Sequence, residues 1–333
     1  MYRKLILAAG LLAFAVVLLG AYVRLSDAGL GCPDWPGCYG QFSPAHAQQE
    51  ISQAHAERPH GPVSLAKAWK EMAHRYLASI LGLLIVIIGI IAWRQREPLQ
   101  QGIGLPLFLI GFVILQGLFG MWTVTLKLTP IIVTLHLLGG MLTLSLLTWL
   151  WQRQRQQIPA VRGDDALRIK GVASFAALVV LLQIALGGWV SSNYAALACA
   201  GFPTCNGKWL PAMDLQHGFQ LVRELGLTAQ GGLLSGQALT AIHWVHRIGA
   251  VVTLLVVGWL VFKMLRVPAL TRAGGFIALI LMAQLSLGVA NVLLSLPLPV
   301  AVAHNAVAAL LLMALVRLNF RLRIARKRDL AGV

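Results

Sequence analysis

Four histidines recur in two matched pairs along the chain. His74 and His136 lie in the first half, and His246 and His304 occupy the matching places in the second half. All four fall at or inside long apolar runs, where an ionisable side chain is costly and indicates a functional site. For one isolated histidine, a hydrogen bond to a carbonyl of a neighbouring helix explains the position equally well. Repetition of the whole pair favours a shared role as ligands.

Two imidazoles on facing helices of a four-helix bundle suit haem iron, with one imidazole on each face of the porphyrin. A zinc ion needs about four ligands, and no further Cys or Asp is found at matching depth. The pattern therefore predicts one haem in each half. Arg75 and Arg247 directly follow two of the histidines and are candidates for charge-assisted hydrogen bonds to haem propionates. Snorkelling to the membrane interface is an equally good explanation of both arginines.

One acidic residue distinguishes the two halves. Glu71 lies three residues before His74, about one helical turn away on the same face. The matching position before His246 is His243, for which support of a neighbouring ligand, a role as a spare ligand and an interfacial position all stay open. A carboxylate beside one haem only suggests that the first haem undergoes chemistry, while the second carries electrons. The alternative for Glu71 is a solvated carboxylate that the dipole of the helix favours.

Four cysteines form two closely spaced pairs, Cys32 with Cys38 and Cys199 with Cys205. The spacing permits a disulfide in each of two polar loops, and we expect two structural disulfides. A redox-active pair in the first loop is the alternative. Metal ligation is disfavoured, because neither loop offers a histidine at a spacing typical of zinc sites.

Composition shows what must position these residues. The chain has 333 residues, of which 58% are hydrophobic and only 11% are charged, so lipid is its natural solvent. Apolar runs of about 20 residues, long enough to cross a bilayer, can be placed eight times. The predicted spans are Leu5–Val23, His74–Trp93, Leu105–Thr125, Ile131–Trp151, Gly171–Val190, Ala241–Phe262, Gly274–Leu293 and Val300–Leu318.

The net charge of +16 is a topology signal rather than a sign of nucleic-acid binding, because the cations sit between the apolar runs. The cation-rich segments are both ends of the chain and the even-numbered connections, with Arg94, Arg96, Arg153, Arg155, Arg162, Arg168, Lys263 and Arg266 among their residues. The positive-inside rule places both termini in the cytoplasm and the long loops, roughly 24–73 and 191–240, outside. The first apolar run is too long for a cleaved signal peptide and is expected to be a retained helix.

The chain also repeats itself. Gly20 matches Gly187, the cysteine pairs match at an offset of 167, and Gln116 and Gly120 match Gln284 and Gly288 at an offset of 168. The sequence therefore predicts an all-α integral membrane protein. Its eight transmembrane helices form two pseudo-symmetric four-helix bundles, residues 1–160 and 161–333, that arise from an internal duplication. Because each half has an even number of helices, both halves cross the membrane in the same orientation.

Together, these features resemble the haem A synthase family over nearly the whole chain. The matching elements are Glu71-x-x-His74-Arg75, His136, His246-Arg247, His304 and a cysteine pair in each of two outer loops. The resemblance implies oxidation of a methyl group of haem O to the formyl group of haem A, through hydroxylated intermediates, for assembly of cytochrome oxidase.

The resemblance also implies roles for the site residues. His74 and His136 would hold the substrate haem, His246 and His304 would ligate a resident haem b, and Glu71 would be the catalytic carboxylate. Haem O synthase and an electron donor are the expected partners, in a bacterial cytoplasmic membrane.

Two other functions use the same ligands. A transmembrane cytochrome that oxidises quinol would hold two permanent haems b, although haems that both lie near the outer face are poorly placed for electron transfer across the bilayer. A haem exporter or chaperone would release haem without redox change and would not need Glu71. From the residues alone, the conclusion is a membrane protein with two haems, whose oligomeric state the sequence does not indicate.

Overall fold

The computed structural model describes the chain except residues 101, 155–160, 162 and 331–333, and it also leaves out the side chains of residues 163, 166 and 324–330. Arg155 and Arg162, two of the cations that indicate the topology, therefore lie outside the described residues. The same holds for the basic side chains that follow Arg323.

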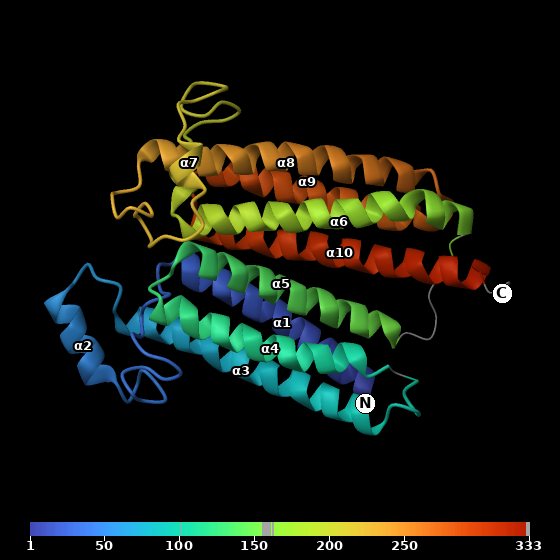
Figure 1. Cartoon of the computed structure of the whole chain (residues 1–333), viewed down its shortest axis with the longest axis horizontal. Helices are drawn as coiled ribbons and strands as arrows, with labels where there is room; N and C mark the ends of the chain where they lie inside the picture. The colour runs from blue at the N-terminus through green and yellow to red at the C-terminus, as the bar shows by residue number, and fades with distance from the viewer. Residues whose placement is uncertain (101, 155–160, 162, 331–333) are drawn as a thin grey trace.

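In the described part of the chain, eight long helices run side by side (Figure 1), and all eight are long and apolar enough to cross a membrane. They are α1 (Tyr2–Leu25), α3 (Leu65–Arg94), α4 (Gly104–Thr125), α5 (Pro130–Arg153), α6 (Gly163–Ser192), α8 (Gly236–Leu265), α9 (Thr271–Leu293) and α10 (Leu298–Leu330). The shorter elements are α2 (Gln48–Glu57), α7 (Leu215–Gly218) and two turns of 3₁₀ helix, η1 (Ala195–Leu197) and η2 (Pro268–Leu270). The prediction of an all-α protein with eight transmembrane helices is confirmed.

Two helices begin several residues before the apolar spans predicted for them. Helix α3 begins well before His74 and α8 begins before Ala241, the residues at which the predicted spans start. Each is capped by a serine, Ser64 or Ser235, whose hydroxyl accepts a hydrogen bond from a backbone N–H three residues on, at 3.3 and 3.1 Å. Such a cap stabilises a polar first turn, so the helix continues beyond the apolar segment that hydropathy detects.

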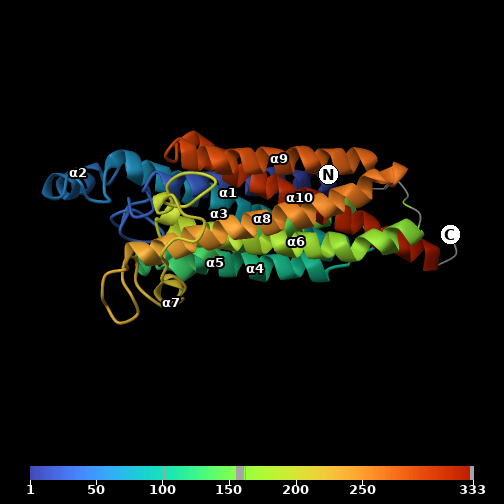
Figure 2. The same cartoon turned by 90° about the horizontal axis from the view of Figure 1, so that it is seen from above.

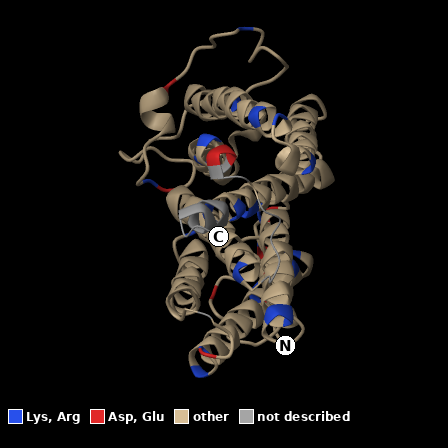
Figure 3. Ribbon diagram, turned by 90° about the vertical axis from the view of Figure 1, so that its right-hand side faces the viewer, with Lys and Arg blue, Asp and Glu red and all other residues tan. Residues whose placement is uncertain are grey.

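The four long helices of each half form a four-cornered bundle. In the first half, α1 and α4 each pack against both α3 and α5, so α3 and α5 occupy opposite corners. In the second half, α6 and α9 each pack against both α8 and α10. The two halves lie one above the other in Figure 1, and Figure 3 looks along their helices.

The halves meet through α1, α5, α6 and α10. At the outer end of this interface, Arg24 donates to the carbonyl of Ser191 at 2.7 Å, and the hydroxyl of Tyr194 donates to Asp27 at 2.5 Å. Both pairs are separated by 167 residues, the offset of the cysteine pairs. Matched positions that touch each other are expected along a two-fold axis. The contacts therefore have pseudo-two-fold symmetry, while a common origin by duplication stays a prediction.

The interior and the outer surface of the helices are both apolar. A continuous core of fully buried side chains, among them Ile85, Leu144 and Leu260, joins the two halves, while Leu83, Leu255 and Phe276 are exposed on the flanks. Such flanks are suited to lipid. The side and top views agree that α2, α7 and the long loops gather at one end, opposite both termini (Figures 1 and 2). The chain is therefore a multi-pass membrane protein, and the end with the long loops is called the outer end below.

Candidate functional site

The structure brings the four histidines together as two pairs. His74 on α3 and His136 on α5 lie at opposite corners of the first bundle, and His246 on α8 and His304 on α10 lie at opposite corners of the second. Each is within about three helical turns of the outer end of its helix. All four residues are half-buried. Both pairs thus have the placement expected for ligands that approach one group from two sides.

A glycine on the neighbouring helix lies against the imidazole that comes from α3 or α8. A Cβ atom at Gly20 of α1 would stand 3.0 Å from Cε1 of His74, and a Cβ atom at Gly187 of α6 would stand 3.2 Å from Cε1 of His246. Neither position has room for a larger side chain unless the ring moves. The matched glycines Gly20 and Gly187 therefore form a cradle of bare backbone for each of these two rings.

The histidines of α5 and α10 have the same arrangement. A Cβ atom at Gly120 of α4 would lie 3.5 Å from Cε1 of His136, and one at Gly288 of α9 would lie 3.2 Å from Cε1 of His304. Glycine at these places lets the helix backbone approach closely. All four rings consequently have their direction set by a helix next to their own.

The ring nitrogens fit a metal-centred cofactor. Nδ1 of His74, His136 and His304 is buried and makes no hydrogen bond to the described residues, an arrangement that is costly in an apolar interior. Among those residues, no group of three or more His, Cys, Asp or Glu side chains comes together as a metal site. A pair of imidazoles suits haem, because the porphyrin supplies the remaining ligands of the iron.

Two glutamines of the second bundle, on helices next to those of its histidines, have amides in contact with the imidazoles. Nε2 of Gln183 lies 3.1 Å from Nδ1 of His246 and also donates to that residue's carbonyl at 3.0 Å. Nε2 of Gln284 lies 3.2 Å from Nε2 of His304. In the sequence, Gln284 stands out only as a matched position, and Gln183 gives no signal because its counterpart in the first half is Val16. The amides orient the histidines of the second bundle.

Glu71 is a buried carboxylate with both oxygens engaged. Its side chain accepts a hydrogen bond from the backbone N–H of Cys32 at 2.9 Å, and the guanidinium of Arg75 forms an ion pair with its other oxygen. The residue is only 4% exposed. The explanation of Glu71 as a solvated carboxylate is therefore wrong, because the outer loop covers it.

Both cysteine pairs form the disulfides expected from their spacing. Cα–Cα distances are 4.9 Å for Cys32–Cys38 and 4.8 Å for Cys199–Cys205. In the first loop both sulfur atoms are shielded from a reductant, since Cys32 and Cys38 are fully buried. The first disulfide loop packs directly on α3, so that a Cβ atom at Gly31 would stand 2.6 Å from the backbone of that helix.

Arg75 and Arg247 each hold a disulfide loop. Arg75 donates to the carbonyls of Asp34 and Gly37 at 2.8 and 2.5 Å. Arg247 donates to the carbonyls of Gly201, Thr204 and Cys199 at 3.0, 3.0 and 2.5 Å. No sequence pattern predicts this role, because it depends on backbone carbonyls of distant loops. A pairing of these arginines with propionates stays a prediction.

The residue at the position of Glu71 in the second half makes a different contact. His243 is buried, and its Nε2 accepts a hydrogen bond from Nε of Arg247 at 3.4 Å. The first half thus has a carboxylate paired with its arginine, and the second half has an imidazole there. This difference is the main chemical asymmetry between the two otherwise similar sites.

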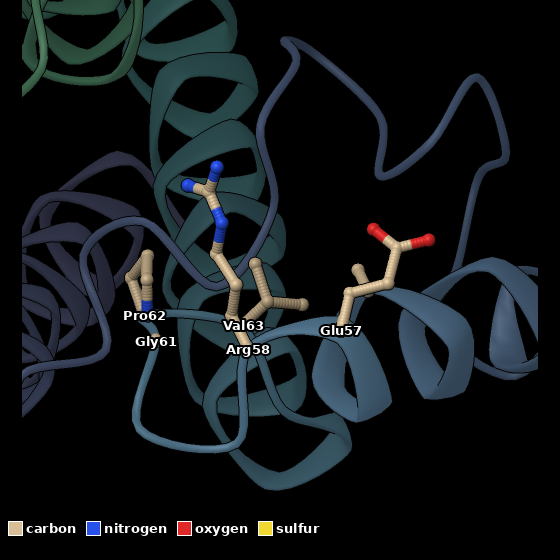
Figure 4. A pocket seen from close by; sticks show the side chains of 6 residues that line it. Glu57, Arg58, Gly61, Pro62 and Val63 are labelled. Atoms are coloured by element: carbon tan, nitrogen blue, oxygen red, sulfur yellow. The ribbon is translucent and has the colours of Figure 1, made fainter.

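A surface depression between α2 and the start of α3 contains none of these residues. It is lined by Ala54, Glu57, Arg58, Gly61, Pro62 and Val63. The side chains of Glu57 and Arg58 point apart in Figure 4. The depression is therefore not a part of either histidine site.

Fold and site together define a class: a multi-pass membrane protein whose two helical bundles each offer a pair of histidines near the outer surface. The chain belongs to the COX15-CtaA family, described as cytochrome oxidase assembly protein, whose profile matches residues 3–316. It is 41% identical to the heme A synthase of Shewanella oneidensis over 92% of each chain. It is 28% identical to the heme A synthase of Rhizorhabdus wittichii, over 93% of this chain and 90% of the other.

Replacing Gly31 tests whether the first disulfide loop is docked on α3. Gly31→Ala places a methyl group against the helix backbone, which we expect to cost about 1–3 kcal/mol and to lift the loop. Reduction of Cys32–Cys38, followed by labelling of free thiols under mild reductant, should become at least about tenfold faster. Gly111→Ala is the control, because no atom lies within 4 Å of its added Cβ. Equal reduction rates in both variants would contradict the docking.

Proposed function

We propose that this chain is a haem A synthase, an oxidoreductase that oxidises a methyl group of haem O to the formyl group of haem A. The proposal is carried by the two pairs of histidines at opposite corners of their bundles, three of which have a buried ring nitrogen without a hydrogen-bond partner among the described residues. Its chemistry is supported by the relatives, which are named heme A synthase and match almost the full length of the chain. The product would serve the assembly of cytochrome oxidase, in agreement with the description of the family.

The two halves have different tasks in this proposal. His74 and His136 hold haem O as substrate, and His246 and His304 hold a haem b. When bound, haem b supplies one-electron redox chemistry. The glycine cradles fix the ring orientation of all four ligands, and the amides of Gln183 and Gln284 further restrain the second pair.

Glu71 is the proposed catalytic carboxylate. Its position one turn outward from His74 brings an acidic group beside the substrate ligand, while the loop above it limits access of water. A carboxylate held in this way can accept a proton or stabilise positive charge that develops as the methyl group is oxidised. The ion pair with Arg75 keeps the side chain in place, and His243 offers no such charge in the other half.

A quinol-oxidising cytochrome fits the geometry less well. All four histidines lie within about three turns of the outer end, so neither pair approaches the opposite membrane face. Electron transfer across the bilayer would need groups at different depths. A haem exporter would have no use for a buried carboxylate beside one pair only.

The proposal includes a location and partners. The chain lies in the bacterial cytoplasmic membrane with both termini in the cytoplasm, as the distribution of Lys and Arg favours. Haem O synthase, as the source of the substrate, and an electron donor are its proposed partners.

The first test is chromatography with mass detection of haems, extracted from membranes that make haem O with and without this chain. We expect haem A, or its hydroxylated precursor, only when the chain is present. His136→Ala should abolish the product, because it removes one ligand of the substrate. Unchanged haem O beside stoichiometric haem b in the purified protein would support the cytochrome instead.

Glu71→Gln tests the catalytic role of the carboxylate. The amide keeps the size of the side chain and an acceptor for the N–H of Cys32, so both haem sites should remain intact. We expect formyl production to fall by about 10²-fold or more, the usual contribution of an acid–base group. His243→Gln, the matched change in the other half, should retain most of the activity. Normal haem A output from Glu71→Gln would remove this residue from the mechanism.

A further inference from the structure

Lys70, one turn outward from His74 on α3, has no ion-pair or hydrogen-bond partner in the part of the chain that the structure describes. It lies four residues before His74, one turn outward on the same face of α3. Its Nζ stands 5.0 Å from the ring centroid of Tyr22, which follows the cradle glycine Gly20 by two residues on α1. Lys70 is half-buried and makes neither an ion pair nor a hydrogen bond with the described residues. Its neighbour Lys67, by contrast, is paired with Asp27 at 3.4 Å.

Arg223 makes the comparable contact with an aromatic ring in the second half. Its guanidinium lies 5.7 Å from the ring centroid of Trp189, which follows the cradle glycine Gly187 by two residues on α6. Arg223 is only 5% exposed, and burial lowers the pKa of its guanidinium. It contacts the side chain of Asn193 and nearby loop carbonyls, but among the described residues it meets no carboxylate, and its Nε has no partner.

The two cations reach matched places from unrelated parts of the chain. Tyr22 and Trp189 are separated by the offset of 167 that relates the cysteine pairs. Lys70 comes from α3, whereas Arg223 comes from the loop that follows α7. The residue that matches Lys70 on α8 is Ile242, which is buried and apolar. Each half thus places a cation against the aromatic residue two positions after its cradle glycine, although the two cations come from different elements.

A buried cation without a counter-charge is costly unless a ligand supplies one. Arg75 and Arg247 are already committed to the carbonyls of the disulfide loops. A porphyrin held by an imidazole pair carries carboxylates on one edge, and these need cations toward the polar end of the bundle. We propose that Lys70 binds a propionate carboxylate of the substrate haem and that Arg223 binds one of haem b.

This inference rests on the proposed function and adds a determinant of specificity to it. An imidazole pair fixes the plane of the porphyrin but leaves it free to rotate within that plane. A carboxylate held at Lys70 removes this freedom. It thereby determines which edge of the substrate, and hence which methyl group, lies toward Glu71.

The experiment compares haem O with its propionate dimethyl ester, which lacks the negative charges. Binding is followed by absorbance titration of the purified full chain, in which the second site is already filled by haem b. The His74→Ala variant is titrated in parallel, and the absorbance change that it lacks is assigned to the first site. Lys70→Gln should bind haem O about 10- to 100-fold more weakly, the usual loss for a hydrogen bond to a charged group, and should bind the ester as the unchanged protein does. Lys70→Arg should restore affinity for haem O. Lys67→Gln is the control and should change neither affinity, because Lys67 is already paired with Asp27.

Arg223 is tested in the same way at the second site. In a His74→Ala background, haem b and its dimethyl ester are titrated into protein freed of haem. Arg223→Gln should weaken binding of haem b alone, and Arg223→Lys should retain most of it because the charge is kept.

The outcomes separate the two proposals. If the unchanged chain binds no haem O at all, the proposed function fails, and this inference fails with it. If the unchanged chain binds haem O, but Lys70→Gln weakens haem O and ester equally or weakens neither, the pairing of Lys70 with a carboxylate is wrong while the function stands. The same comparison with haem b decides the pairing of Arg223.

Discussion

The packing of each imidazole against a glycine of the neighbouring helix is the constraint on which both sites depend. In the first bundle, Gly20 and Gly120 lie against the rings of His74 and His136, so the ring directions follow from how the helices pack. A helix backbone exposed in this way admits a flat ring but no larger side chain. Nδ1 of both rings is buried without a hydrogen-bond partner among the described residues, which is costly in an apolar interior. In the proposed function, helix packing therefore fixes the direction from which each imidazole approaches its haem.

The outer loops matter because they close the bundles at the end where the histidines lie. Each disulfide makes a short rigid turn, and an arginine one residue after a histidine donates to the carbonyls of that turn. The same helix therefore carries both a histidine of the pair and the arginine that holds the loop above it. In the first half this contact also includes Glu71, which joins Arg75 to the N–H of Cys32. The position of the carboxylate consequently depends on the loop being docked.

Much of this arrangement could be predicted from the sequence, because its signals are local. Apolar runs give the eight spans, and repeated residue types at matched offsets give the histidine pairs and both disulfides. The rest depends on contacts between distant segments. The loop-holding role of Arg75, the amide of Gln183 beside His246 and the placement of Arg223 over Trp189 all arise from packing of separate elements. A one-dimensional pattern shows that such residues are polar, but not which atoms they meet.

The two halves differ in the balance of charged groups near their outer ends. In the first half, the ion pair of Glu71 with Arg75 is locally neutral, so the added charge of Lys70 is uncompensated there. In the second half, His243 supplies no carboxylate, and both Arg247 and Arg223 lie near the outer end as cations. Under the proposed function, a bundle with two cations would favour retention of an anionic cofactor. A bundle with a neutral pair and one half-buried lysine would hold the same kind of ligand less strongly, which suits a substrate that must leave as product.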